Sequence, residues 1–96
     1  MSEAFHLPAE LTIYGAAQVR GALLASIAAE QGAPTAPFVV DGAAVCEVDA
    51  AGIQLLVSLA QMLAKRGRKV QLLDPAAPLV RACRLLGVSQ AFGVPA

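Results

Sequence analysis

Two aspartates, Asp41 and Asp49, could support acid–base chemistry, because each ends an apolar segment and the two could meet in space. Paired carboxylates can divide the roles of acid and base between them. Each aspartate also has a simpler role. Asp41 can cap the loop after a strand at residues 38–42, and Asp49 can accept hydrogen bonds from the first N–H groups of a following helix. We therefore favour two caps over a catalytic pair.

The rest of the chemical inventory is small. The one histidine, His6, lies in a predicted strand, where a surface or edge position is more typical than a role as a ligand. Cys46 and Cys83 are far apart and have no metal-ligand neighbours, so we expect two small core residues in a reducing compartment. The sequence has no recognisable nucleophile–base pair, phosphate-binding glycine loop or metal-ligand cluster. It therefore predicts a protein that is not an enzyme and has no metal or cofactor.

The segment "EVDAAGIQ", residues 47–54, carries a stronger signal because it begins a predicted helix. A helix N-terminus presents unpaired N–H groups and the positive end of the helix dipole, which favour anions and phosphoryl groups. A hydroxyl there would suit phosphorylation, but Ala50 and Ala51 carry none. Gly52 can either leave the backbone open to a partner or pack tightly against a strand. The sequence leaves both roles of this glycine open.

The composition is that of one small domain with no net charge. The chain has 96 residues, 57% apolar and 4% aromatic, so we expect a single domain over residues 1–96. Seven basic residues balance seven acidic ones, which gives no electrostatic preference for nucleic acid or anionic lipid. The basic residues around Gly67 are expected to form a solvated helix end and turn: Lys65, Arg66, Arg68 and Lys69.

No segment of the sequence suits membrane insertion or secretion. Residues 52–64 are the most apolar stretch, but Gln54, Ser58 and Gln61 interrupt it and it is too short to cross a bilayer. The first ten residues carry two glutamates and lack the apolar run of a secretory signal. We therefore expect a cytoplasmic protein.

Short apolar strands alternate with helices along the chain. Apolar spacing and the positions of glycine and proline predict a strand pair at 4–7 and 10–13, a helix at 15–30, a strand at 38–42, a short strand or loop at 45–48, a helix at 50–66 and a strand at 68–74. A third helix is predicted to start at Asp74–Pro75 or at Ala77–Pro78 and to end at Gly87. This alternation predicts an α/β fold with a mixed four- to five-stranded β-sheet and helices packed mainly on one face.

The predicted helices differ in how much of their surface is polar. The second helix has a single narrow polar stripe, which indicates a helix that is buried or covered by a partner; the stripe is Gln54, Ser58, Gln61 and Lys65. The first helix has one apolar stripe, made of Val19, Leu23, Leu24 and Ile27. In the third helix the inward stripe is predicted to be Leu79, Cys83 and Leu86.

The order of these segments resembles the STAS domain, the family of sulfate-transporter tails and anti-sigma-factor antagonists. The similarity extends over about residues 11–94 and is most specific in "VDAAGIQLL", which resembles the Asp-Ser-Ser/Thr-Gly motif that opens the second helix of the family. The resemblance implies a sheet of four or five strands covered by helices. Single-domain bacterial members bind a protein partner, often a serine kinase that is also an anti-sigma factor.

In that family, phosphorylation of the hydroxyl residue before the motif glycine breaks the complex. The resemblance places Ala51 at this phosphoacceptor position, where it cannot be phosphorylated. Asp49 matches the motif aspartate, Gly52 the motif glycine and Asp41 the aspartate that ends the preceding strand. Thr12 departs from the aspartate that many antagonists carry there.

We expect a non-enzymatic protein-binding regulator in a partner-switching or chemotaxis-linked signalling pathway, with an anti-sigma factor, a serine-kinase-like protein or another signalling protein as partner. The predicted partner surface is Tyr14, Gly15, Asp49, Ala50, Ala51, Gly52 and Gln54, supported by Asp41. The alternative is a cytoplasmic accessory subunit of a lipid ABC transporter of the outer-membrane asymmetry type, docked on its ATPase. A third possibility is phosphorylation of another hydroxyl, at Ser58, Thr12 or Ser26.

Overall fold

The computed structural model describes residues 4–31 and 35–94. Its elements, in chain order, are β1 (Phe5–His6), β2 (Glu10–Leu11), α1 (Ala16–Ala29), β3 (Phe38–Asp41), β4 (Glu47–Val48), α2 (Ala50–Ala64), β5 (Val70–Leu73), α3 (Ala77–Leu85) and the short 3-10 helix η1 (Ser89–Phe92). The predicted α/β fold with three helices is confirmed, but the four to five strands expected in one mixed sheet are five strands divided between two sheets. Each helix and the strands β3 and β5 begin and end within a few residues of the predicted bounds.

The strands form two small sheets in which the described pairings are parallel. One sheet has the order β1-β3-β5 and the other pairs β2 with β4. The prediction that the first two strands pair with each other is therefore wrong. The chain runs on past Pro8, and the two halves bond to different strands: the Leu7 N–H donates to Asp41 O, whereas Ala9 O accepts from the Cys46 and Glu47 N–H groups.

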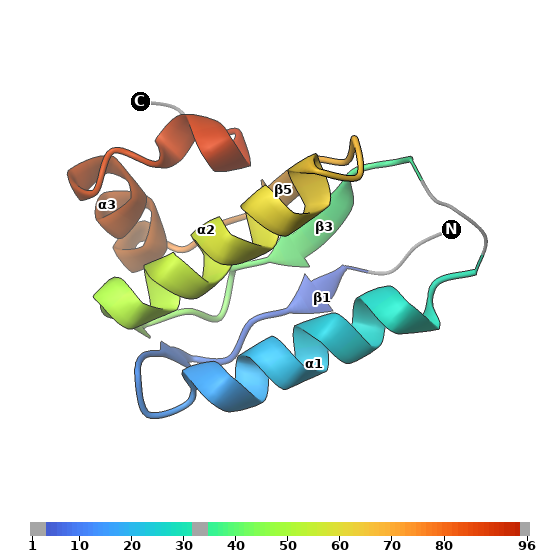
Figure 1. Cartoon of the computed structure of the whole chain (residues 1–96). Coiled ribbons are helices and arrows are strands. Elements are labelled where there is room, and N and C mark those ends of the chain that lie inside the picture. Colours follow the sequence, from blue (N-terminus) through green and yellow to red (C-terminus); the bar gives the residue numbers. More distant parts are fainter. Residues whose placement is uncertain (1–3, 32–34, 95–96) are drawn as a thin grey trace.

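Helices α1 and α2 lie side by side over one face of the larger sheet, with α3 at one end of α2 (Figure 1). Side chains alternate along β3 and β5, so that every second residue is buried; these are Phe38, Val40, Val70 and Leu72. The residues between them, such as Gln71 and Leu73, are exposed on the other face. The expectation that helices pack mainly on one face is confirmed.

Helix α2 supplies much of the core. Leu56 and Leu63 are fully buried, while the predicted polar stripe (Gln54, Ser58, Gln61 and Lys65) is exposed as expected. No helix in the described residues is long and apolar enough to span a membrane.

Helix α3 buries less of its predicted inner stripe than expected. Leu79 and Cys83 are fully buried, but Leu86 is half exposed. The reason is that α3 ends at Leu85 and the chain turns at Gly87 with φ 71°, which carries Leu86 away from the helical face. The expectation for Cys46 was also wrong, since this residue is exposed and its Sγ lies 3.4 Å from Ala9 O.

The basic cluster after α2 is not uniformly solvated as predicted. The Arg68 side chain is only 5% exposed and forms a two-pronged ion pair with Glu30, at 2.6 Å from Nη1 to Oε1 and 2.8 Å from Nη2 to Oε2. Its Nε donates to Ala36 O, and its guanidinium lies 5.4 Å from the centre of the Phe38 ring. The ion pair links the C-terminal end of α1 to the segment just before β5.

Candidate functional site

Asp49 holds the start of α2 and the turn before α1 together. Its Oδ1 accepts a hydrogen bond from the Gly52 N–H at 3.0 Å, which confirms the predicted helix cap. Its Oδ2 accepts from the Ile13 N–H, also at 3.0 Å. The Ile13 N–H, followed by that of Gly52, lowers the pKa of this carboxyl, so Asp49 is anionic at neutral pH. One carboxylate thus fixes two segments that lie 36 residues apart.

Gly52 is buried beneath this junction, and the structure favours the second of its two possible roles. A Cβ at this position would lie 2.0 Å from the carbonyl oxygen of Leu11, well inside any allowed contact. The same Leu11 oxygen accepts a hydrogen bond from the Asp49 N–H at 3.3 Å, so the strand cannot easily move aside. The glycine therefore lets α2 pack against β2 and does not itself form an exposed surface.

The turn between β2 and α1 presents two large apolar side chains to solvent. The Gly15 N–H donates to Thr12 O at 3.1 Å and closes the turn, in which Ile13 is 66% exposed and Tyr14 is 95% exposed. Thr12 points inward and is buried. Ile13 was missed by the sequence analysis, which placed it at the end of a strand. The signal available was an apolar residue next to the exposed-turn tyrosine.

We call this region the docking edge: Ile13, Tyr14, Gly15, Asp49, Ala50, Ala51 and Gln54. The turn and the start of α2 lie next to each other at one end of the helix pair (Figure 1). Of the residues predicted for a partner surface, Tyr14, Ala50 and Gln54 are exposed, while Gly15, Asp49 and Ala51 are half-buried. Gly52 is the one predicted residue that lies beneath the surface. The edge therefore combines exposed apolar side chains with small residues on a backbone fixed by Asp49.

Asp41 and His6 form a separate polar pair at the sheet. Asp41 Oδ1 accepts from the Ala43 N–H at 2.8 Å, which confirms the predicted loop cap, and Oδ2 lies 3.2 Å from His6 Nδ1. His6 sits on the outer strand β1 with its side chain largely exposed, as expected for an edge residue. The two aspartates thus have different hydrogen-bond partners, in keeping with two caps.

The described part of the chain contains no group of three or more His, Cys, Asp or Glu side chains that could hold a metal ion. Among the hydroxyls considered as alternative phosphorylation sites, Ser58 is exposed, Ser26 is half-buried and Thr12 is buried. Ser58 is therefore the most accessible of the three.

Comparisons with known proteins agree with this fold. A family model described as "Mlab, STAS domain" matches residues 2–94. The structure resembles the crystal structure of a sulfate transporter family protein from Wolinella succinogenes, with a TM-score of 0.74 and 22% sequence identity over 95% of this chain and 70% of that chain. A comparison with curated protein sequences gave no match. At this level of identity, the structural likeness supports the fold alone.

Proposed function

The chain belongs to the STAS domain family, and we propose that it is a non-enzymatic regulator that binds a signalling protein through the docking edge. The partner is an anti-sigma factor, a serine-kinase-like protein or a related component of a partner-switching or chemotaxis-linked pathway in the cytoplasm. Phosphorylation at position 51 cannot switch this binding off, because Ala51 has no hydroxyl.

The observation that carries this proposal is the exposed Ile13–Tyr14 pair beside the start of α2. An aromatic side chain 95% exposed contributes nothing to the fold, yet tyrosine is among the residues that dominate binding energy at protein interfaces. Both backbones are fixed, since Asp49 bonds to the Ile13 and Gly52 N–H groups. Because this surface is already ordered, binding a partner would cost little conformational entropy here.

Ala51 supports a partner surface without a phosphorylation switch. A phosphoryl group at the start of α2 would add about two negative charges beside Asp49, and like-charge repulsion and desolvation would oppose an apolar partner. With alanine at this position that mechanism is absent. Release of the partner must then depend on the concentrations of the two proteins, on a change in the partner, or on phosphorylation of another hydroxyl such as that of the exposed Ser58.

Substitutions of exposed residues test this proposal without disturbing the fold. We expect Tyr14→Ser combined with Gln54→Arg to abolish co-purification of the partner from native cells, measured by quantitative mass spectrometry against the unmodified chain. Gln61→Arg is the matched control, because Gln61 lies on the same exposed stripe of α2 but two turns further along. A partner retained by the double variant, or lost equally with Gln61→Arg, would show that the docking edge is not its binding site.

A second candidate function is a cytoplasmic accessory subunit of a lipid ABC transporter. It is favoured by the description of the matching family model, "Mlab, STAS domain", and by Ala51, since docking on an ATPase needs no phosphorylation cycle. The same co-purification separates the two functions. Recovery of an ABC-transporter ATPase that depends on Tyr14 and Gln54 would support this candidate, whereas a kinase, phosphatase or chemotaxis protein would support the first.

A further inference from the structure

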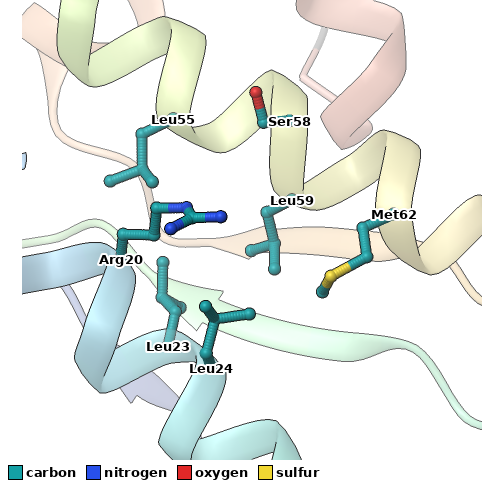
Figure 2. A pocket seen from close by; sticks show the side chains of 7 residues that line it. All are labelled: Arg20, Leu23, Leu24, Leu55, Ser58, Leu59 and Met62. Carbon is teal, nitrogen blue, oxygen red and sulfur yellow. The ribbon is translucent and has the colours of Figure 1, made fainter. Parts of the chain in front are cut away.

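A groove runs between α1 and α2, on the outer side of the helix layer (Figure 2). It has a volume of about 140 Å³, and its walls are almost entirely apolar; the residues that line it are Arg20, Leu23, Leu24, Leu55, Ser58, Leu59 and Met62. The floor is formed by core residues that are already rigidly packed, since Leu23 is 1% exposed and Leu59 is 5% exposed. The groove is therefore preformed.

One wall of the groove is an apolar side chain that the fold leaves uncovered. Leu24 belongs to the apolar stripe that the sequence predicts for the inner face of α1, yet it remains 36% exposed. Figure 2 shows Leu24 on α1 facing Leu59 and Met62 across the groove. An apolar side chain seated here would remove the exposed parts of these walls from water, which is favourable in proportion to the area covered.

The two helices that form the groove carry one charged side chain, and it is positive. The segments of α1 and α2 contain a single charged residue, Arg20, whose guanidinium reaches between Leu55 and Leu59 (Figure 2). Among the described residues no carboxylate pairs with Arg20: Glu30, just after α1, is bonded to Arg68, and Asp49, just before α2, is bonded to backbone N–H groups. Arg20 can therefore accept an acidic partner group without breaking an existing bond.

We propose that this groove receives one apolar side chain from an acidic amphipathic helix of a partner protein, with an Asp or Glu one turn away on that helix paired to Arg20. The pairing would fix the register of the helix, and the buried apolar anchor would supply most of the affinity. The groove is lined by none of the residues of the docking edge, so this proposal does not rest on the function proposed above.

The size of the groove and the charges elsewhere on the chain distinguish this occupant from others. A volume of about 140 Å³ holds one large apolar side chain but falls below the roughly 300 Å³ typical of small-molecule sites. A second copy of the chain is disfavoured by charge. Its most exposed leucine, Leu85, lies beside Arg81 and Arg84, and these would meet Arg20 with the same sign.

A library of helical peptides displayed on phage provides the probe for this groove. Panning against the purified chain should enrich peptides that carry Leu, Phe or Met one helical turn from Asp or Glu. For a labelled enriched peptide, fluorescence anisotropy should show binding about tenfold weaker to Arg20→Glu, and changing the peptide's acidic residue to Lys should restore binding to that variant. Amide chemical shifts of Leu24, Ser58 and Met62 should change on binding.

Arg81→Glu is the matched control, because it makes the same charge change on exposed α3 and should leave binding unchanged. Tyr14→Ser alone, in the turn before α1, should also leave peptide binding unchanged, which separates this groove from the docking edge. The proposal is overturned if panning yields no binder, if enriched peptides lack acidic residues, or if Arg20→Glu and Arg81→Glu weaken binding equally. A dimer in sedimentation velocity that dissociates on Arg20→Glu would assign the groove to a second copy and also overturn it.

Discussion

Two carboxylates hold the two ends of the helix pair, and they do so in different ways. Asp49, before α2, accepts hydrogen bonds from the backbone N–H groups of Ile13 and Gly52. Glu30, after α1, accepts from the guanidinium of Arg68, a side chain 38 residues away that is almost fully buried. At the Asp49 end the neighbouring side chains stay exposed and form the docking edge. At the Glu30 end the bonding side chain is itself part of the interior.

The difference shows how this small domain combines a stable fold with an available surface. Backbone bonds to Asp49 fix the position of the turn without using the side chains of Ile13 and Tyr14, so these remain available to a partner. In the Glu30–Arg68 pair both side chains are instead engaged in joining α1 to β5, so neither is available to a partner. We therefore assign the exposed side chains at the first end to binding and the two paired side chains at the second end to stability. The following variants test this division from the largest expected effect to the smallest.

The largest loss of stability is expected for Gly52→Ala, at the Asp49 end. The added Cβ would lie 2.0 Å from Leu11 O, so α2 and β2 must separate, at a cost of about 3 kcal/mol in the free energy of unfolding. Chemical denaturation measures this. Gly21→Ala in α1 is the control, because a Cβ there meets nothing within 4 Å and alanine should stabilise the helix by about 0.5–1 kcal/mol. Equal effects of the two variants would contradict the assignment of Gly52 to close packing.

The next largest loss is expected for Arg68→Met, at the Glu30 end. This change leaves the Glu30 carboxylate without its partner, and because Glu30 is partly exposed we expect a loss of about 2 kcal/mol, below the range for fully buried pairs. Arg66→Met, at an exposed neighbouring position, should change stability by less than about 0.5 kcal/mol. If Arg68→Met reduced partner binding in co-purification without lowering stability, the division between the two ends would fail.

For Asp49→Ala we expect a smaller loss of stability than for Arg68→Met, but a larger increase in the mobility of the docking edge. The Ile13 and Gly52 N–H groups lose their acceptor, so the turn before α1 should become more mobile. Hydrogen exchange should show faster exchange of the Ile13 amide, together with weaker partner binding. Glu47→Ala, an exposed acidic residue on β4, should leave that amide protected. An unchanged Ile13 amide in Asp49→Ala would mean that the carboxylate does not fix the turn.

The smallest expected effect is the dependence of stability on pH at the two ends. Hydrogen bonds from Arg68 lower the pKa of Glu30, and hydrogen bonds from the Ile13 and Gly52 N–H groups lower that of Asp49. A carboxyl with a lowered pKa in the folded state stabilises the fold above its ordinary value, 4.5 for Glu30 and 3.8 for Asp49, and loses that contribution as pH falls through the lowered pKa.

Denaturation between pH 6 and pH 2 should therefore show a decline in stability that is shallower in both Arg68→Met and Asp49→Ala than in the unmodified chain. The two reductions should add, because the carboxylates have no partner in common. A decline of the same steepness in all three proteins would show that neither pair contributes to the pH dependence.

Local patterns in the sequence were sufficient for much of the fold. Helical spacing of apolar residues located α1, α2 and α3, and the caps at Asp41 and Asp49 followed from their positions next to a strand end and a helix start. The exposed polar stripe of α2 was also predictable. These features depend on residues within a few positions of each other, where backbone geometry decides which groups can meet.

Predictions that depended on distant segments were less successful. The first two strands do not pair with each other, because each finds a parallel partner elsewhere in the chain. Leu86 is exposed where burial was expected because the chain turns at Gly87, and Cys46 is exposed directly after the buried Val45. Such outcomes depend on where the chain returns to the sheet, which spacing along the sequence does not encode.

For this protein the sequence by itself determined the helices and the α/β class, because these follow from local periodicity and residue chemistry. The family, and with it the missing hydroxyl at Ala51, followed from the resemblance of the segment order and of "VDAAGIQLL" to the STAS domain. Only the tertiary structure decided that Gly52 lies against Leu11, that Arg68 is buried with Glu30, and that Ile13 stands beside α2. Each of these contacts joins residues roughly 40 positions apart, and packing of the helices onto the sheet brings them together.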